Sequence, residues 1–163
     1  LFKSVKNFMN NKLDILFGTE TGNAQGLAEN IAEELTTLGI ENELSDLSEC
    51  PISILSSIEK ALIIVSTWGE GEPPPLMEEF FYDLESGDAG ELPKLKYAMI
   101  ALGDTDYDEF CGCGRKMDKF LKTAGANNFM ETLELDAFYD DEVTEWKAKF
   151  FPKIKSMMEI SNA

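Results

Sequence analysis

Hydrophobic residues along the chain gather in short runs, and these runs alternate with longer segments of helical spacing. The runs at 13–17, 61–66 and 97–102 have the length of strands. Their nearly continuous apolar character is typical of strands that are covered on both faces. In the segments between and after them, apolar residues recur every three or four positions, as in amphipathic helices. This spacing predicts helices at 24–38, at 76–86, after position 111 to about 125, and at 142–160.

Two weaker segments complete the pattern. Positions 40–47 alternate only weakly, which predicts a polar edge strand, and 129–135 are expected to form the last strand. Strands that alternate with helices predict the α/β class, with a parallel sheet, right-handed crossovers and helices on both faces. We interpret 13–160 as one domain. Residues 1–12 form an N-terminal segment, either a short helix that packs on the domain or a frayed tail.

The predicted sheet points to the place of a ligand site. In open parallel sheets ligands bind outside the carboxyl ends of the strands, where three loops leave this sheet: 18–24, 66–72 and 103–111. The first loop carries Thr19, Thr21 and Asn23 ahead of a helix, so it offers hydroxyl and backbone N–H donors to a phosphate dianion. Its glycines match neither the dinucleotide pattern nor the P-loop. The alternative is an ordinary turn in which the threonines cap the helix.

The strong negative charge of the chain limits the kinds of partner that it can bind. Its 163 residues carry 31 acidic and 14 basic side chains, for a formal net charge of −17. Nucleic acid and anionic membranes are poor partners for such a surface, and no apolar run approaches the roughly 20 residues of a membrane helix. With three cysteines and no histidine, neither a disulfide framework nor a zinc site is expected. We therefore expect a cytoplasmic monomer without a metal.

The second and third loops each place one aromatic residue, Trp68 and Tyr107, at the edge where the phosphate turn lies. Aromatic residues in loops more often pack against the protein than stack on a ligand. The coincidence of two aromatics with a phosphate turn nevertheless fits a flat aromatic ring with a phosphate tail. The two side chains would hold the ring between them.

Three blocks of sequence, at 19–24, 66–71 and 102–111, resemble in order and spacing those of flavodoxins. They are still more similar to the FMN domains of diflavin reductases such as cytochrome P450 reductase and the sulfite reductase flavoprotein. The resemblance covers about 13–152. It implies the doubly wound, five-stranded parallel sheet of order 2-1-3-4-5 that is known for flavodoxins, with FMN as the cofactor.

The resemblance also implies a function. Such proteins shuttle single electrons between a reductase and an acceptor through the semiquinone and hydroquinone of the flavin. Because the chain is strongly acidic, the expected partners are basic-surfaced redox proteins, one the donor and one the acceptor. A free-standing chain would be an electron carrier without a catalytic residue, and an excised one would be the FMN domain of an NADPH-dependent oxidoreductase.

In the family, the first block binds the phosphate, and the aromatics corresponding to Trp68 and Tyr107 lie on opposite faces of the flavin ring. Gly69 matches a glycine whose carbonyl meets flavin N5–H, and the third block lines the ring and the ribityl chain. The residues that the resemblance assigns to the FMN site are Thr19, Glu20, Thr21, Gly22, Asn23, Ala24, Ser66, Thr67, Trp68, Gly69, Glu70, Gly71, Leu102, Gly103, Asp104, Tyr107, Phe110 and Cys111.

Other α/β families fit less well. A response-regulator receiver needs acidic residues after the first strand and an aspartate after the third, where this chain has Gly18 and Ser66. A low-molecular-weight phosphatase needs a C-x5-R loop, whereas Cys111 and Arg115 are four positions apart. A receiver-like or scaffolding domain without flavin remains the alternative. We interpret Cys111 and Cys113 as packing groups, because a disulfide across one residue is strained.

Overall fold

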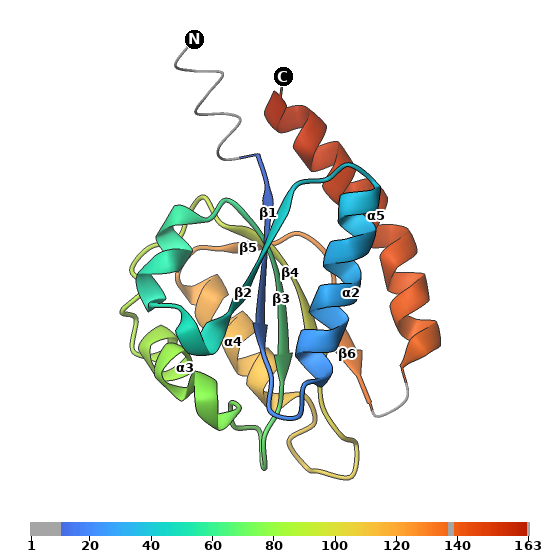
Figure 1. Ribbon diagram of the computed structural model, residues 1–163. Coiled ribbons are helices and arrows are strands. Elements are labelled where there is room, and N and C mark those ends of the chain that lie inside the picture. The colour runs from blue at the N-terminus through green and yellow to red at the C-terminus, as the bar shows by residue number, and fades with distance from the viewer. Residues whose placement is uncertain (1–10, 137–138, 163) are drawn as a thin grey trace.

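The computed structural model describes residues 11–136 and 139–162, which form a central sheet with helices on both faces (Figure 1). Most of the predicted N-terminal segment 1–12 lies outside the described residues. The strands are β1 (Leu13–Gly18), β2 (Asn42–Asp46), β3 (Lys60–Ser66), β4 (Lys96–Leu102), β5 (Asn127–Asn128) and β6 (Leu133–Leu135). The α-helices are α2 (Asn23–Thr37), α3 (Glu78–Glu85), α4 (Gly112–Thr123) and α5 (Asp140–Asn162), and short 3-10 turns are η1 (Leu47–Glu49), η2 (Ile52–Ser57) and η3 (Pro75–Met77).

The sheet is parallel and its strand order is β2-β1-β3-β4-β5, which confirms the predicted order. Every residue of β1 is buried, and in β3 only the last is not. In β2, by contrast, no residue is fully buried, as expected for a polar edge strand. The fully apolar strands therefore occupy the centre of the sheet, where helices cover both faces.

The last strand differs from the prediction. Instead of one strand at 129–135, two short strands pair with β4: β5 beside its start and β6 beside its end. Between them the side chain of Asn128 accepts a hydrogen bond from Met130 N at 3.4 Å and donates one to Thr132 Oγ1 at 3.1 Å. Such local side-chain bonds compete with the strand ladder, so the continuous strand expected over 129–135 was wrong.

Helices α2 and α5 cover one face of the sheet, and α3 and α4 cover the other (Figure 1). On the first face, Ile31 of α2 and Phe150 of α5 are fully buried. On the second, Phe80 of α3 and Leu121 of α4 are buried in a separate cluster. Burying an apolar side chain of this size stabilises a fold by about 1.5–3 kcal/mol. The two clusters hold the sheet rigid beneath the loops at its carboxyl edge.

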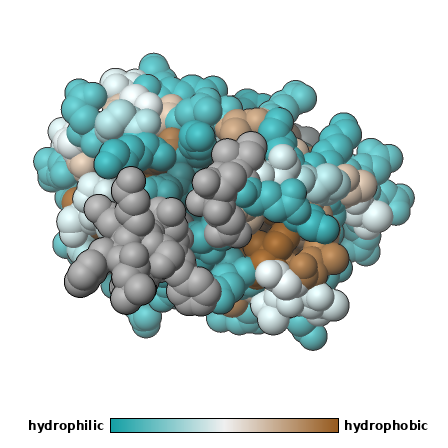
Figure 2. Space-filling model, turned by 90° about the horizontal axis from the view of Figure 1, so that it is seen from above, coloured by the Kyte–Doolittle hydropathy of each residue, from teal (hydrophilic) through white to brown (hydrophobic). Residues whose placement is uncertain are grey.

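Those loops lie at the opposite end of the molecule from the C-terminus (Figure 1). The end of the molecule at which α5 ends is hydrophilic over most of the described surface in Figure 2, apart from one hydrophobic patch. Across the described residues, the structure has no helix that is both long and apolar enough to cross a membrane. The three loops predicted to form the site thus lie together at one end of the sheet (Figure 1).

Candidate functional site

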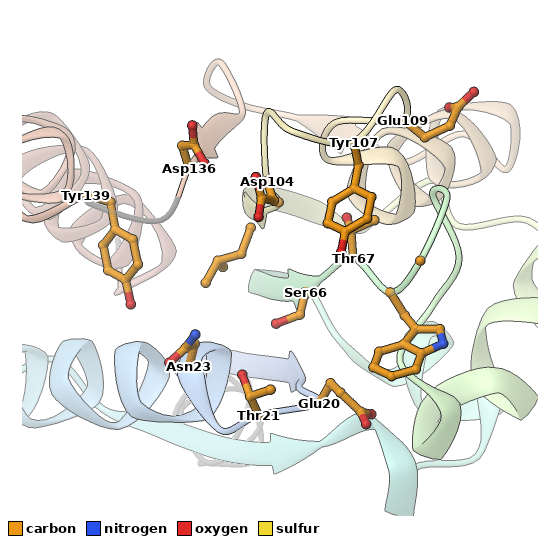
Figure 3. A pocket seen from close by; sticks show the side chains of 14 residues that line it. Glu20, Thr21, Asn23, Ser66, Thr67, Asp104, Tyr107, Glu109, Asp136 and Tyr139 are labelled. Carbon is orange, nitrogen blue, oxygen red and sulfur yellow. The ribbon is translucent and has the colours of Figure 1, made fainter.

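A cavity of about 510 Å³ opens at the carboxyl edge of the sheet. Figure 3 shows Thr21 and Asn23 of the first loop on one side, facing Asp104 and Tyr107 of the third loop across it. The residues that line the cavity are Glu20, Thr21, Asn23, Ser66, Thr67, Trp68, Gly69, Leu102, Gly103, Asp104, Tyr107, Glu109, Asp136 and Tyr139. All three predicted loops thus contribute to one cavity.

The first loop presents neutral donors to this cavity. Gly22 has a left-handed φ of 91°, which lets the chain turn sharply from β1 into α2, and its amide donates to Thr19 Oγ1 at 2.9 Å. The helical hydrogen bonds begin with Gly26 N, which donates to Gly22 O at 2.9 Å. The amides of the first turn, from Asn23 on, have no acceptor within the helix. No acidic residue lies in this first turn, so it suits an anion.

The second loop is a tight hairpin. Trp68 N donates to Glu72 O at 2.8 Å, and Glu72 N donates to Trp68 O at 2.9 Å. The hairpin is closed by Gly69 and Gly71, both at positive φ (48° and 87°), a conformation that other residues rarely adopt. Trp68 lines the cavity although 45% of its surface is exposed. An indole so exposed at a cavity is placed to cover an aromatic ligand.

The third loop is held close to the sheet. A Cβ atom on Gly103 would come within 2.6 Å of Cys111 N, so a glycine is required for this approach. Cys111 has a φ of 54° where the loop enters α4, and its buried thiol donates to Ala101 O at 3.3 Å. Tyr107, at the outer part of the loop, lines the cavity and is 55% exposed. The loop therefore has an anchored base and presents a second exposed aromatic ring.

Burial disfavours the thiolate form of both buried cysteines of the third loop and α4. Burial raises the pKa of Cys111 to about 12, and it raises the pKa of Cys113 to about 12 as well. Both thiols are therefore protonated near neutral pH, and neither forms a disulfide. Within the described residues, no group of three histidine, cysteine, aspartate or glutamate side chains is placed to bind a metal.

The structure brings a fourth segment to the cavity that the sequence analysis did not include. Asp136 follows β6 directly, and Tyr139 precedes α5; both line the cavity (Figure 3). Asp136 accepts hydrogen bonds from Thr105 Oγ1 at 2.5 Å and from Thr105 N at 3.4 Å. The rule that sites lie at the carboxyl ends of strands would have found Asp136, had it been applied to the last strand too.

Two cations of α4 also reach the loops. Arg115 forms a paired hydrogen bond with Glu134 of β6, at 2.5 and 2.9 Å, and its guanidinium lies 5.7 Å from the ring centroid of Phe110. Lys116 Nζ donates to Gly71 O at 3.0 Å. The loops themselves contain no basic residue, so these contacts could not be predicted from the loop sequences.

Of the predicted site residues, eleven line the cavity, and the other seven are set back from the lining. Ala24 and Cys111 are buried beneath the loops, and Gly71 of the hairpin is buried against the start of α4. Thr19 accepts the amide of Gly22, and Phe110 lies under Arg115. The residues outside the lining are Thr19, Gly22, Ala24, Glu70, Gly71, Phe110 and Cys111.

The donors and rings of the cavity fit FMN. The start of α2 offers neutral amides and hydroxyls, which can bind the phosphate of FMN without a lysine or arginine nearby. Trp68 and Tyr107 supply two exposed aromatic rings on different loops for its flat ring system. A cavity of about 510 Å³ lies within the range of small-molecule sites, roughly 300–1,000 Å³.

Comparison with known proteins gives a consistent result. The flavodoxin family model matches residues 15–147. The chain is 39% identical over 147 residues to the sulfite reductase [NADPH] flavoprotein alpha-component of Aliivibrio fischeri, covering 90% of this chain and 24% of that protein. It is 36% identical to the Bacillus subtilis protein of the same name, covering 83% of this chain and 22% of that protein. The chain thus spans about a quarter of these relatives.

Solved structures of free-standing flavodoxins have the same fold. A flavodoxin of Streptococcus pneumoniae TIGR4 superposes with a TM-score of 0.77 at 27% identity, covering 89% of this chain and 98% of that one. Oxidised flavodoxin 1 of Bacillus cereus superposes with a TM-score of 0.75 at 25% identity, covering 89% of this chain and 97% of that one.

Proposed function

The chain belongs to the flavodoxin family, and from this premise we propose that it is the FMN module of a larger NADPH-dependent flavoprotein. As a member of this family it binds FMN and transfers electrons, which confirms the prediction from the sequence and leaves the receiver-like or scaffolding alternative unsupported. FMN supplies one-electron and two-electron chemistry when it is bound. The protein's own task is to hold the cofactor, exclude water from it and present it to partners.

The proposed contacts follow from the cavity. The first-turn amides of α2, with Thr21 and Asn23, would hold the phosphate by charge-assisted hydrogen bonds. Trp68 and Tyr107 would cover the ring system. Asp104 lines the same cavity between these groups and is placed for the polar middle part of the cofactor. The supporting observation is that donors and aromatics from three separate loops line one cavity.

The assignment to a larger flavoprotein rests on sequence identity. The chain is 39% identical to part of a sulfite reductase flavoprotein, but only 27% identical to the free-standing flavodoxin of Streptococcus pneumoniae. The names of these relatives support NADPH as the electron source and a sulfite-reducing protein as the acceptor. The three unpaired thiols support a reducing cytoplasmic setting.

Two measurements test this function. Mass spectrometry of the ligand that heat releases from the purified protein should identify FMN, and a protein that cannot take up added FMN would refute the proposal. An antibody against this chain should detect a polypeptide several times longer than these 163 residues in the source cells. A polypeptide of only this length would instead support a free-standing carrier.

The acidic residues around the cavity support a basic partner. Five exposed carboxylates lie on the second and third loops: Glu70, Glu72, Asp106, Asp108 and Glu109. A concentration of negative charge attracts a positively charged protein surface and speeds its encounter. We infer that redox partners dock here through basic residues, beside the proposed position of the flavin.

Salt dependence tests the docking surface. Electron transfer to a basic haem protein should slow as salt rises, because exposed charges are screened within about 10 Å at 0.1 M. The double variant Glu70→Gln with Glu72→Gln should reduce this dependence. A matched control, Glu85→Gln with Asp88→Asn, removes two exposed charges at the last residue of α3 and in the turn after it, and should not reduce the dependence. A wild-type rate that does not respond to salt would contradict electrostatic docking.

A further inference from the structure

The hairpin that bears Trp68 is stabilised by more than its own two hydrogen bonds. Its base is attached to the sheet by Thr67 N, which donates to Leu102 O at 3.1 Å. Its outer half, from Gly69 to Glu72, contains two glycines at positive φ and two exposed glutamates. Glycines lose more backbone entropy on ordering than other residues. Contacts from outside the hairpin would therefore help it to hold one conformation.

Such contacts come from α4. Gly71 is buried against the start of this helix, so closely that a Cβ atom on Gly112 would lie 2.5 Å from Gly71 Cα. Cys113 N donates to Thr67 Oγ1 at 3.4 Å. One turn further along, Lys116 Nζ donates to Gly71 O at 3.0 Å, across 45 positions of sequence. Gly71 is buried and the Lys116 donor is charged, so this hydrogen bond is expected to be stronger than one between neutral groups.

We propose that Lys116 is a positioning residue for FMN binding. Its ammonium group holds the carbonyl of Gly71, which fixes the hairpin and thereby the indole of Trp68 at the cavity. Lys116 does not line the cavity, so it acts through the hairpin and not by touching the ligand. The assignment of FMN rests on the proposed function, but the attachment of the hairpin does not.

Charge makes Lys116 well suited to this role. The hairpin carries Glu70 and Glu72, and Glu109 of the third loop packs beside Gly71. Like charges on neighbouring loops repel each other and would push the hairpin outward. A lysine between them offsets this repulsion while its hydrogen bond fixes the backbone. Methionine at this position would keep the apolar stem but lose both effects, whereas arginine would keep them.

The first test needs no ligand. Amide hydrogen exchange of Trp68 and Glu72, the donors of the two hairpin bonds, should accelerate several-fold in Lys116→Met and stay unchanged in Lys116→Arg. The matched control is Lys119→Met, which alters an exposed lysine on the same helix. Exchange in the core strand β4 should not change in any variant. Hairpin exchange that is equal in Lys116→Met and the wild type would overturn the proposal.

The second test uses ligands. Because the hairpin carries a ring contact and no phosphate contact, Lys116→Met should weaken FMN and riboflavin by the same factor, about three- to tenfold, whereas Lys116→Arg and Lys119→Met should bind like the wild type. A loss for FMN alone, or an equal loss in Lys119→Met, would overturn the proposed role. If the wild-type protein bound no flavin while Lys116→Met still freed the hairpin, the proposed function would fail and the attachment would stand.

Discussion

The hydroxyl of Thr105 donates to Oδ2 of Asp136 over 2.5 Å and joins the third loop to the segment that follows β6. The backbone amide of Thr105 donates to the same carboxylate at 3.4 Å. Tyr107, two positions away, lines the cavity together with Asp136. The hydrogen bond therefore holds the loop that bears Tyr107 against the segment after β6, across 31 positions of sequence.

Loss of this bond should weaken flavin binding. In Thr105→Val the side chain keeps its shape but cannot donate, so the third loop becomes freer and Tyr107 less well placed. A hydrogen bond to a carboxylate contributes about 1.5–3 kcal/mol; at this exposed site we expect about 1 kcal/mol, or roughly a fivefold rise in the Kd for FMN. Fluorescence titration measures the Kd. In the control Thr123→Val, which loses only a bond to Lys119 O on α4, the affinity should not change.

Truncation of either exposed aromatic of the cavity should also weaken binding. Trp68→Ala and Tyr107→Ala should each cost about 1–3 kcal/mol of flavin affinity, from lost stacking and lost apolar contact. Isothermal titration with FMN measures the change. Tyr82→Ala is a matched control, because Tyr82 is 48% exposed but lies on α3 away from the cavity lining. If Tyr82→Ala lost as much affinity as the other two, the aromatics would not be the ring contacts.

The effect of Thr21→Ala on affinity should depend on whether the ligand carries a phosphate. Thr21→Ala removes a hydroxyl at the start of α2, so it should weaken FMN by several-fold and leave riboflavin, which lacks the phosphate, nearly unchanged. Parallel titrations of the two ligands give the ratio. Thr37→Ala, at the other end of the same helix, serves as the control. An equal loss for both ligands in Thr21→Ala would place the phosphate elsewhere.

Asp118 should make the stability of the fold depend on pH. Burial opposes its ionisation, but hydrogen bonds from Lys122, Tyr97 and Asn128 outweigh burial and hold the pKa of Asp118 below its usual value. A carboxylate with a depressed pKa stabilises the fold at pH values above its unfolded pKa of about 3.9. That contribution is lost as the pH falls through the lower folded pKa.

The corresponding variant is Asp118→Asn. It should reduce the free energy of unfolding at pH 7 by about 1–2 kcal/mol, and its difference from the wild type should shrink below about pH 4. Urea unfolding at several pH values measures both. Asp88→Asn changes an exposed carboxylate on the same side of the sheet and should show neither effect. A difference that stayed constant down to pH 2 would contradict this role of ionised Asp118.

The sequence by itself determined the elements and most of the site. Continuous apolar runs predicted β3 and β4, because a strand that is covered on both faces is apolar at nearly every position. Helical spacing predicted α2, because a helix that is buried on one face has apolar residues every three or four positions. The donors of the first loop and the aromatics Trp68 and Tyr107 were also predicted. They lie at the ends of predicted strands, and the carboxyl ends of parallel strands share one edge.

Only the tertiary structure decided which distant residues join that edge. Asp136 meets Thr105 and Lys116 meets Gly71 across 31 and 45 positions, and no local period records a contact between segments so far apart. The split of the last strand depends likewise on the side chain of Asn128, which competes with the pairing to β4. A sequence pattern reports how each segment is buried, whereas the partner of a loop residue is set by the packing of helices on the completed sheet.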